Sequence, residues 1–245
     1  MPSQTRTQLL FVFMLVVAAM SGCASLPDNT KRDPRDPLER YNRSVFRFNQ
    51  VLDRHVARPI AVGYKKFTPQ PVRVGVSNFL SNFTYPVVVV NDLLQAKVGN
   101  AGRDVARFVV NSTIGLGGLF DPASKWGLEM NNEDLGQTLG KWGVPPGAYL
   151  MLPILGPVTV RDGVGDVGDF FFNPVAYIDA SNIQLGLAGL DLLDRRYDLL
   201  DADEALDQAF DPYAFLRSAY LQRRQYLVLD GNMPDDEPVD ESAEQ

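Results

Sequence analysis

Long stretches of this 245-residue chain carry no charged side chain, and prolines and asparagines interrupt them. Beyond the N-terminal segment, the longest are Val74–Asn91 and Trp142–Val160. A helix of a soluble protein usually presents charged side chains on its outer face at every turn or two, and these segments present none. The four prolines of Trp142–Val160 also exclude an ordinary membrane-spanning helix, which needs about 20 apolar residues. Two interpretations stay open: a large dry core inside a polar shell, or a domain partly embedded in lipid with an internal polar passage.

The charged residues lie between these runs and in the C-terminal tail. The last eleven residues carry six of the 30 acidic residues and no basic one, which leaves 24 acidic against 23 basic residues in the rest. A nearly neutral body has no basic field to neutralise phosphates, so the sequence predicts no nucleic-acid partner. Residues 232–245 are predicted to form a disordered acidic tail.

The N-terminal segment indicates where the chain resides. Leu9–Met20 is an uncharged apolar run of the length of a signal-peptide core, too short to span a bilayer. Ser21, Gly22 and Cys23 follow it and resemble a bacterial lipobox, in which the chain is cut before the cysteine and the cysteine is acylated. We therefore expect a signal peptide over residues 1–22 and lipid attachment at Cys23. The alternative is a buried structural cysteine.

The residue after the cysteine indicates in which membrane the lipid anchor lies. Ala24, rather than an aspartate, resembles the sorting pattern of lipoproteins sent to the outer membrane. Because Cys23 is the only cysteine, the chain cannot contain an internal disulfide framework. Several acyl chains, at about 0.8 kcal/mol per buried CH₂, would make the anchor effectively permanent. The sequence predicts a lipid-anchored protein on the periplasmic face of the outer membrane, with a flexible tether over residues 23–35.

One mainly helical domain is predicted over residues 36–231. Asp36–Glu39 (Asp-Pro-Leu-Glu) has the pattern of a capping box, and Asp-Pro recurs at residues 121 and 211. Helical spacing of apolar residues follows after residue 40, over 72–83, over 101–109 and from 212 to a terminating Gly231. In the first of these helices, Tyr41, Val45, Phe48 and Leu52 are expected to pack. The mostly polar stripe beside them is expected to face a wetter environment; it consists of Asn42, Phe46, Asn49 and Asp53. Few strands are expected, and Tyr149–Leu152 and Val158–Val160 are the best candidates.

Catalytic and cofactor chemistry has little support. His55 is the only histidine and is expected on the surface, and no Gly-x-Ser-x-Gly nucleophile motif is present. Gly163–Gly168 matches the dinucleotide-binding pattern, but Phe170–Pro174 follows too closely to leave room for the crossover helix. Asp201 and Asp203 could form a metal-binding pair, but a solvated acidic face is the better interpretation of this acid-rich stretch. The sequence predicts no catalytic residue, no metal site and no cofactor.

The order of several motifs resembles the MlaA (VacJ) family of outer-membrane lipoproteins. The resemblance covers Asp36 to about Gly231, nearly all of the chain after the predicted tether. The most specific stretches are Asp36–Arg43, Asn111–Gly115, Gly136–Val144, Leu152–Pro157 with Arg161 and Asp162, and Asp211–Tyr213 with Arg217 and Tyr220.

The resemblance implies a ring-shaped helical domain in the inner leaflet of the outer membrane, around a central polar channel. Such proteins remove phospholipid that is mislocalised to the outer leaflet and pass it to a soluble periplasmic carrier. An ATP-powered inner-membrane transporter lies downstream. They sit beside trimeric porins and break no covalent bond. The charge-free runs that polar residues interrupt agree with this picture, because a charged headgroup needs a polar route through hydrocarbon.

Polar residues within the uncharged runs are the candidates for lining such a channel. They are Asn78, Asn82, Asn111, Ser112 and Thr113. For each of them, helix capping or a buried hydrogen bond within the ring is an equally good interpretation. The glycine-rich stretch Gly140–Gly147 is either a mobile segment that gates the passage or a rigid loop of turns.

Two other functions stay open. One is a lipid-anchored adaptor that scaffolds porins without conducting lipid. The other is a phospholipase, although the chain offers no good nucleophile–base pair for it.

Overall fold

The computed structural model describes residues 33–178 and 180–233, and the fold is mainly helical, as expected. Cys23, the signal peptide, most of the tether and nearly all of the acidic tail lie outside the described residues. The elements are α2 (Glu39–Leu52), the π-helical η1 (Asp53–Ala57), α3 (Arg58–Phe67), α4 (Gln70–Leu94), α5 (Val98–Thr113), α6 (Pro122–Lys125), α7 (Leu135–Lys141), β1 (Tyr149–Leu152), β2 (Gly156–Thr159), α8 (Val160–Phe170), the 3₁₀ turn η2 (Pro174–Tyr177), α9 (Ser181–Asp198), the 3₁₀ turn η3 (Leu199–Ala202), α10 (Asp203–Gln208) and α11 (Pro212–Val228).

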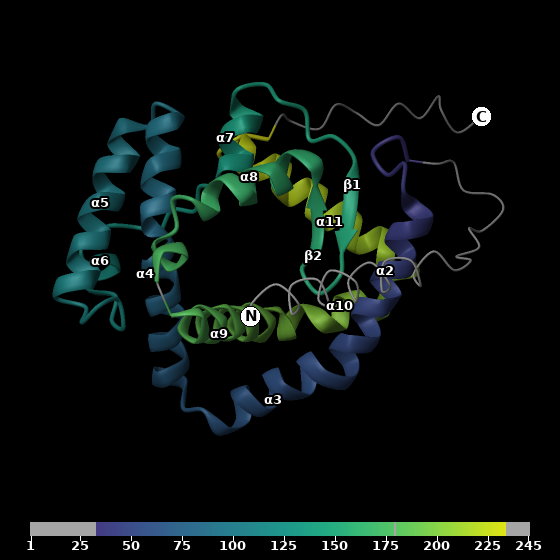
Figure 1. The fold of residues 1–245 in the computed structure, drawn as a ribbon, viewed down its shortest axis with the longest axis horizontal. Helices are drawn as coiled ribbons and strands as arrows, with labels where there is room; N and C mark the ends of the chain where they lie inside the picture. The colour runs from purple at the N-terminus through teal and green to yellow at the C-terminus, as the bar shows by residue number, and fades with distance from the viewer. Residues whose placement is uncertain (1–32, 179, 234–245) are drawn as a thin grey trace, which may run out of the picture.

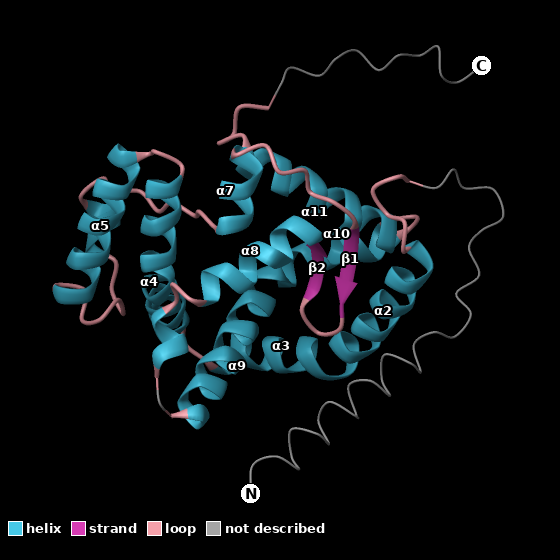
Figure 2. Ribbon diagram, turned by 45° about the horizontal axis from the view of Figure 1, so that its top comes forward, coloured by secondary structure: helices cyan, strands magenta, loops and turns pink. Residues whose placement is uncertain are grey.

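The elements follow one another around a centre that no ribbon crosses, which confirms the expected ring shape (Figure 1). Helix α4 forms one side, α9 the next, and the β-hairpin with α11 and α8 the remainder. Helix α9 packs against both α3 and α4, and α4 also contacts α7, so the chain closes on itself. Helices α5 and α6 lie outside α4 and form a separate lobe (Figures 1 and 2).

The only sheet among the described residues is an antiparallel hairpin in which β1 pairs with β2, Tyr149 opposite Thr159. The predicted strand Tyr149–Leu152 is confirmed with its bounds. The predicted strand Val158–Val160 overlaps β2 only at residues 158 and 159, because Thr159 caps α8 and Val160 begins that helix. Two asparagines of α2 hold the free edge of β1: the side chain of Asn42 bonds the carbonyl of Tyr149 and the N–H of Met151, at 3.0 and 2.8 Å. Asn49, two turns later, bonds the carbonyl of Leu152 and the N–H of Ile154 in the same way. These amides replace a neighbouring strand and satisfy backbone groups that would otherwise be unpaired.

The apolar core is small and surrounds this hairpin. It contains Val45, Phe46, Tyr149, Met151 and Tyr213. The expectation for α2 was wrong in one respect, because Phe48 is exposed whereas Asn42, from the supposedly wetter stripe, is fully buried. The reason is the hairpin, whose free edge offers hydrogen-bonding partners to a polar side chain inside the fold.

The aspartates that precede prolines start helices at two of three predicted places. Asp121 accepts a hydrogen bond from the N–H of Ser124, and Asp211 accepts one from the N–H of Ala214. The third expectation, at Asp36, was wrong: Leu38 is the N-cap of α2, and the buried carboxylate of Asp36 instead accepts bonds from Tyr213 and Arg217, far along the chain.

Helix α4 runs through the first uncharged segment without a break, although Pro86 lies inside it. The asparagines and the proline were expected to interrupt this segment, and they do not. Pro86 removes one helical N–H, and α4 contacts α5, α7 and α9 along its length. Packing on several sides therefore outweighs the local preference.

The glycine pattern at 163–168 lies inside α8, so it does not form a phosphate-binding turn. A Cβ atom on Gly165 would lie 2.4 Å from the backbone nitrogen of Gly136 in α7, closer than real Cβ contacts permit. A Cβ atom on Gly168 would meet the side chain of Leu135. These glycines let α8 and α7 approach backbone to backbone.

Candidate functional site

The distribution of polar and apolar side chains is inverted relative to an ordinary soluble domain. Among the described residues, 39 large hydrophobic side chains are exposed, whereas 12 hydrophobic residues are buried. Sixteen polar or charged residues are buried. Scattered exposed apolar residues are normal, but most polar and charged residues of a soluble protein are exposed. The molecule therefore combines an apolar outside with a polar inside.

Two parts of the surface hold much of this apolar area. The end of α5 and the loop after it expose Ile114, Leu116, Leu119 and Phe120. The end of α8 and the following 3₁₀ turn expose Phe170, Phe171, Phe172 and Tyr177. Trp126 and Trp142 are exposed as well, by 60% and 57%. Contiguous apolar patches with aromatic residues are typical of surfaces that contact lipid or another protein.

None of the described helices combines the length and apolar character needed to span a bilayer.

A network of charges joins α7, α8 and α11 where these helices meet. The Arg224 guanidinium bonds both oxygens of Asp134, at 2.6 and 2.8 Å, and one oxygen of Asp162, at 2.9 Å. Arg161 and Tyr220 also bond Asp162. Burial alone would raise the pKa of Asp134 and of Asp162, but the hydrogen bonds and charge of Arg224 lower both pKa values below 3.8.

A second network joins α2 to α11. Asp36 accepts hydrogen bonds from Asn42, Tyr213 and Arg217, and its side chain is completely buried. Arg43 bonds Asp211 through both terminal nitrogens, at 3.1 and 2.7 Å. Burial and the bond to Asp36 raise the pKa of the Tyr213 hydroxyl, so it remains a hydrogen-bond donor. The two networks therefore join distant segments of the ring through polar contacts, beside the small apolar core.

The five predicted lining residues all lie on α4 and α5. Asn82 donates to the hydroxyl of Ser112 at 2.9 Å, and this bond ties the two helices together. Asn111 is buried, donates to Asp121 and accepts from the N–H of Ala123. Asn78 contacts the carbonyl of Leu119 at 3.5 Å, and Thr113 donates to the Val109 carbonyl of its own helix.

These contacts support the packing interpretation for Asn82 and Asn111, because their amides are used within the lobe. Asn82 also lies against Gly118, whose positive φ of 92° and missing Cβ let the loop after α5 reach α4. Ser112 is half-buried and Thr113 is exposed, so both keep surface that another molecule can reach. A lining role stays a prediction.

The buried charged residues were missed from the sequence. Arg107 is buried and bonds Ser124, the Leu128 carbonyl and Asp121. Asp92, Asp104 and Glu133 are buried as well. The sequence did contain a signal for these buried charges, since Asp92–Arg107 is a cluster of charged residues between two uncharged runs. In a chain whose surface is apolar, such a cluster is a candidate for the interior.

The other sequence candidates occupy peripheral positions. His55 is exposed, as expected, and its Nδ1 lies 2.8 Å from the Val51 carbonyl of its own turn. Asp201 is exposed and pairs with Lys65, whereas Asp203 is held between Arg58 and Arg196. The expected solvated face is therefore confirmed for Asp201 only. The first two residues of the glycine-rich stretch Gly140–Gly147 end α7, and the rest lead toward the hairpin. Residues 141–147 are all exposed.

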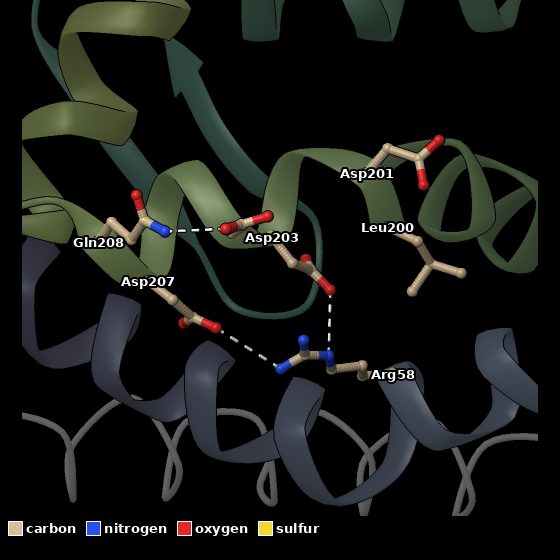
Figure 3. Close-up of a pocket in the computed structure, with 7 residues that line it drawn as sticks. Arg58, Leu200, Asp201, Asp203, Asp207 and Gln208 are labelled. Atoms are coloured by element: carbon tan, nitrogen blue, oxygen red, sulfur yellow. Dashed lines mark hydrogen bonds and ion pairs between the residues drawn. The ribbon is translucent and has the colours of Figure 1, made fainter.

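An open cavity of about 510 Å³ lies between α3 and the η3–α10 segment (Figure 3). Its lining is polar, and Arg58 points toward Asp203 and Asp207, at 3.0 and 3.6 Å. The lining contains four acidic residues and a single apolar one, Leu200. Such a site repels a phosphate and offers no apolar walls to an acyl chain. The cavity is therefore a poor lipid site.

The sequence profile of the MlaA lipoprotein family matches residues 34–227. The chain belongs to the MlaA family. The intermembrane phospholipid transport system lipoprotein MlaA of Escherichia coli is 36% identical over 235 residues, which cover 94% of this chain and 92% of that protein. Its counterpart in Haemophilus influenzae is 34% identical and covers 93% of both chains.

Other relatives agree with this assignment. An uncharacterized protein of Rickettsia typhi is 40% identical over 195 residues, 79% of this chain and 78% of the relative. A solved structure that concerns the structural basis for maintenance of bacterial outer membrane lipid asymmetry matches with a TM-score of 0.73 and 36% identity. The match covers 80% of this chain and all of that one. A ring of helices with a small hairpin is thus the fold of an MlaA-family protein.

Proposed function

We propose that this protein is an outer-membrane lipoprotein that removes mislocalised phospholipid from the outer leaflet and passes it to a soluble periplasmic carrier. The observation that carries the proposal is the inversion of the molecule, with large apolar side chains outside and ion-pair networks inside. The similarity to proteins named as lipoproteins of an intermembrane phospholipid transport system supports it.

The inversion suits a domain that lies in one leaflet. An apolar surface patch such as Phe170–Phe172 gains about 25 cal/mol per Å² when it leaves water, so acyl chains are a favourable neighbour for it. A charged headgroup, in contrast, costs several kcal/mol to move through hydrocarbon without polar partners. A ring in the inner leaflet, with a polar passage at its centre, would let the headgroup cross while the acyl chains stay in lipid.

The anchor and the partners belong to the same proposal. Acylated Cys23 would hold the ring at the periplasmic face of the outer membrane. Trimeric porins beside the ring would position it in the bilayer, and the periplasmic carrier would receive the lipid.

The proposed process is transfer without covalent catalysis. Phospholipid hydrolysis needs an activated nucleophile within hydrogen-bond reach of a base. His55, the only histidine of the chain, is exposed and its Nδ1 is engaged with a carbonyl of its own turn. A phospholipase is therefore the weaker alternative.

The test is complementation in a Gram-negative host that lacks its own MlaA-family protein. Outer-leaflet phosphatidylethanolamine is measured by labelling whole cells with an amine-reactive reagent that does not cross the membrane. We expect labelling to rise in the deletion strain and to return to its original level with this chain. Persistent labelling despite normal amounts of the protein in the outer membrane would contradict the proposal.

A second measurement separates the alternatives. Purified protein is incubated with phospholipid vesicles, and release of fatty acid would reveal a phospholipase. If the chain binds porin but restores no asymmetry, the adaptor function is the correct one.

A further inference from the structure

Two buried carboxyl groups on neighbouring helices form no ion pair with a cation among the described residues. Asp92, near the end of α4, and Asp104, in α5, are both completely buried. The side-chain amide of Asn131 lies between them, with its nitrogen 3.3 and 3.4 Å from the oxygens of Asp92 and 3.1 Å from Asp104 Oδ2. Asp104 Oδ1 is buried without a partner that donates a hydrogen bond. The side-chain nitrogen of Asn131 is thus a hydrogen-bond donor shared by both carboxyl groups.

The charged groups around this pair are engaged elsewhere. Lys97, in the turn between α4 and α5, pairs with Glu133 and with Asp230. Arg107, one turn after Asp104 in α5, pairs with Asp121. Tyr85 of α4, beside Arg107, is buried, and its hydroxyl has no partner. The segment before α7 adds a further acid, Glu133, so the surroundings of the pair are more acidic than basic.

Two adjacent carboxylates in a buried site do not both ionise at neutral pH, because neither water nor a cation compensates the charge. Burial raises the pKa of Asp92 to about 7, and the hydrogen bond and charge of Asp104 and the charge of Glu133 contribute, against the opposing charge of Lys97.

We propose that Asp92 and Asp104 share one proton, and that loss of this proton loosens the segment 128–134 from the α4–α5 hairpin. Asn131 belongs to that segment, and Asp134 at its end caps α7 and binds Arg224. The pair therefore connects the α4–α5 hairpin to the part of the ring built from α7, α8 and α11. The shared proton makes this connection sensitive to periplasmic pH. This inference does not depend on which molecule the protein transports.

The sign of the effect follows from proton linkage. Because the pKa of Asp92 in the folded protein lies above 3.8, the ordinary value of an aspartate, the folded state holds a proton that the unfolded chain has lost. The stabilising contribution is complete below about pH 4 and is lost as the pH rises through about 7. Stability should therefore fall between pH 5 and pH 8.

The test compares thermal unfolding of the full chain in detergent at pH 5 and pH 8 for three proteins. The Tm of the wild type should fall across this range, and Asp92→Asn, whose amide mimics the protonated acid at every pH, should show a smaller fall. Asp201→Asn, at an exposed carboxylate of η3, should fall as the wild type does. Parallel falls in the wild type and in Asp92→Asn would overturn the proposal.

Infrared difference spectroscopy observes the proton itself. The wild type at pH 6 should show the C=O band of a protonated carboxylic acid, and this band should disappear at pH 9 while the helices remain. The band should be absent or weaker in Asp92→Asn, which separates it from bands of Asp166, Asp169 and Asp194, whose pKa values burial also raises. Absence of any such band at pH 6 would equally overturn the proposal. Hydrogen exchange of residues 128–134, corrected for its intrinsic pH dependence, should accelerate over the same range.

Discussion

Gly136 of α7 and Gly165 of α8 lie backbone against backbone, so close that a Cβ atom on Gly165 would sit 2.4 Å from the Gly136 nitrogen. This contact brings the two helices that carry Asp134 and Asp162 within reach of the single guanidinium of Arg224. A glycine contact and an ion-pair network therefore depend on each other.

The glycine contact predicts that Gly165→Ala destabilises the fold. The added methyl group meets backbone atoms that cannot rotate away, and overpacking of this kind costs about 1–3 kcal/mol. The matched control is Gly163→Ala in the same helix, where the nearest atom is 3.5 Å away; alanine there should be neutral or stabilise by up to about 1 kcal/mol. Urea unfolding measures both, and equal free energies of unfolding would show that the close approach has no consequence.

Removal of Arg224 should be among the most damaging single changes. Arg224→Met leaves the carboxylates of Asp134 and Asp162 without their main cation, and breaking a buried pair costs about 3–5 kcal/mol. The control Arg195→Met breaks an exposed pair with Asp191 and should cost less than about 0.5 kcal/mol. If both variants unfold at the same urea concentration, the network is not a source of stability.

The same carboxylates predict a response to acid. Their folded pKa values lie below 3.8, so the stability they provide is present above that pH and is lost as the pH falls through the lowered values. The wild type should lose stability below about pH 4, and Arg224→Met should lose less, because its carboxylates are no longer held in the charged form. Thermal unfolding between pH 2 and pH 6 measures the difference, and parallel curves would contradict it.

The apolar surface predicts that a charge at an exposed phenylalanine affects lipid contact and leaves folding intact. Phe171 is 63% exposed, so Phe171→Glu should change the free energy of unfolding by less than about 0.5 kcal/mol. Binding of the purified protein to phospholipid vesicles should weaken, whereas Phe171→Leu should bind as the wild type does. Unchanged vesicle binding by the glutamate variant would remove this patch from the lipid-contact surface.

Substitutions on α5 should separate packing from channel lining. Asn111→Leu leaves the Ala123 N–H without its partner and removes a bond to Asp121, which should cost about 1–3 kcal/mol. Ser112→Phe is the test of lining: if Ser112 faces the passage, outer-leaflet labelling should rise at normal protein amounts. Normal labelling by this variant would exclude Ser112 from the passage.

The anchor predicts that Cys23→Ser gives an unprocessed precursor or a protein that is free of the outer membrane. Metabolic labelling with palmitate and membrane fractionation measure this result. A Cys23→Ser protein that is processed and sits in the outer membrane would show that the lipid is attached elsewhere or is not needed.

The sequence alone determined the features of this protein that depend on neighbouring residues. The helices after Asp121 and Asp211, the strand Tyr149–Leu152 and the mainly helical class follow from caps, spacing and turns, because these interactions extend over only a few residues. Even the inverted character was visible as charge-free runs, although it stayed one of two interpretations.

Only the tertiary structure decided which polar groups lie inside. Asp36 was expected to cap a helix, and instead it binds Tyr213 and Arg217, nearly two hundred residues later. Asn42 was expected to face a wetter environment, and instead it holds the edge of the hairpin. The physical reason is that a buried polar side chain is stable only when a partner satisfies it, and that partner comes from a distant segment which no local pattern identifies.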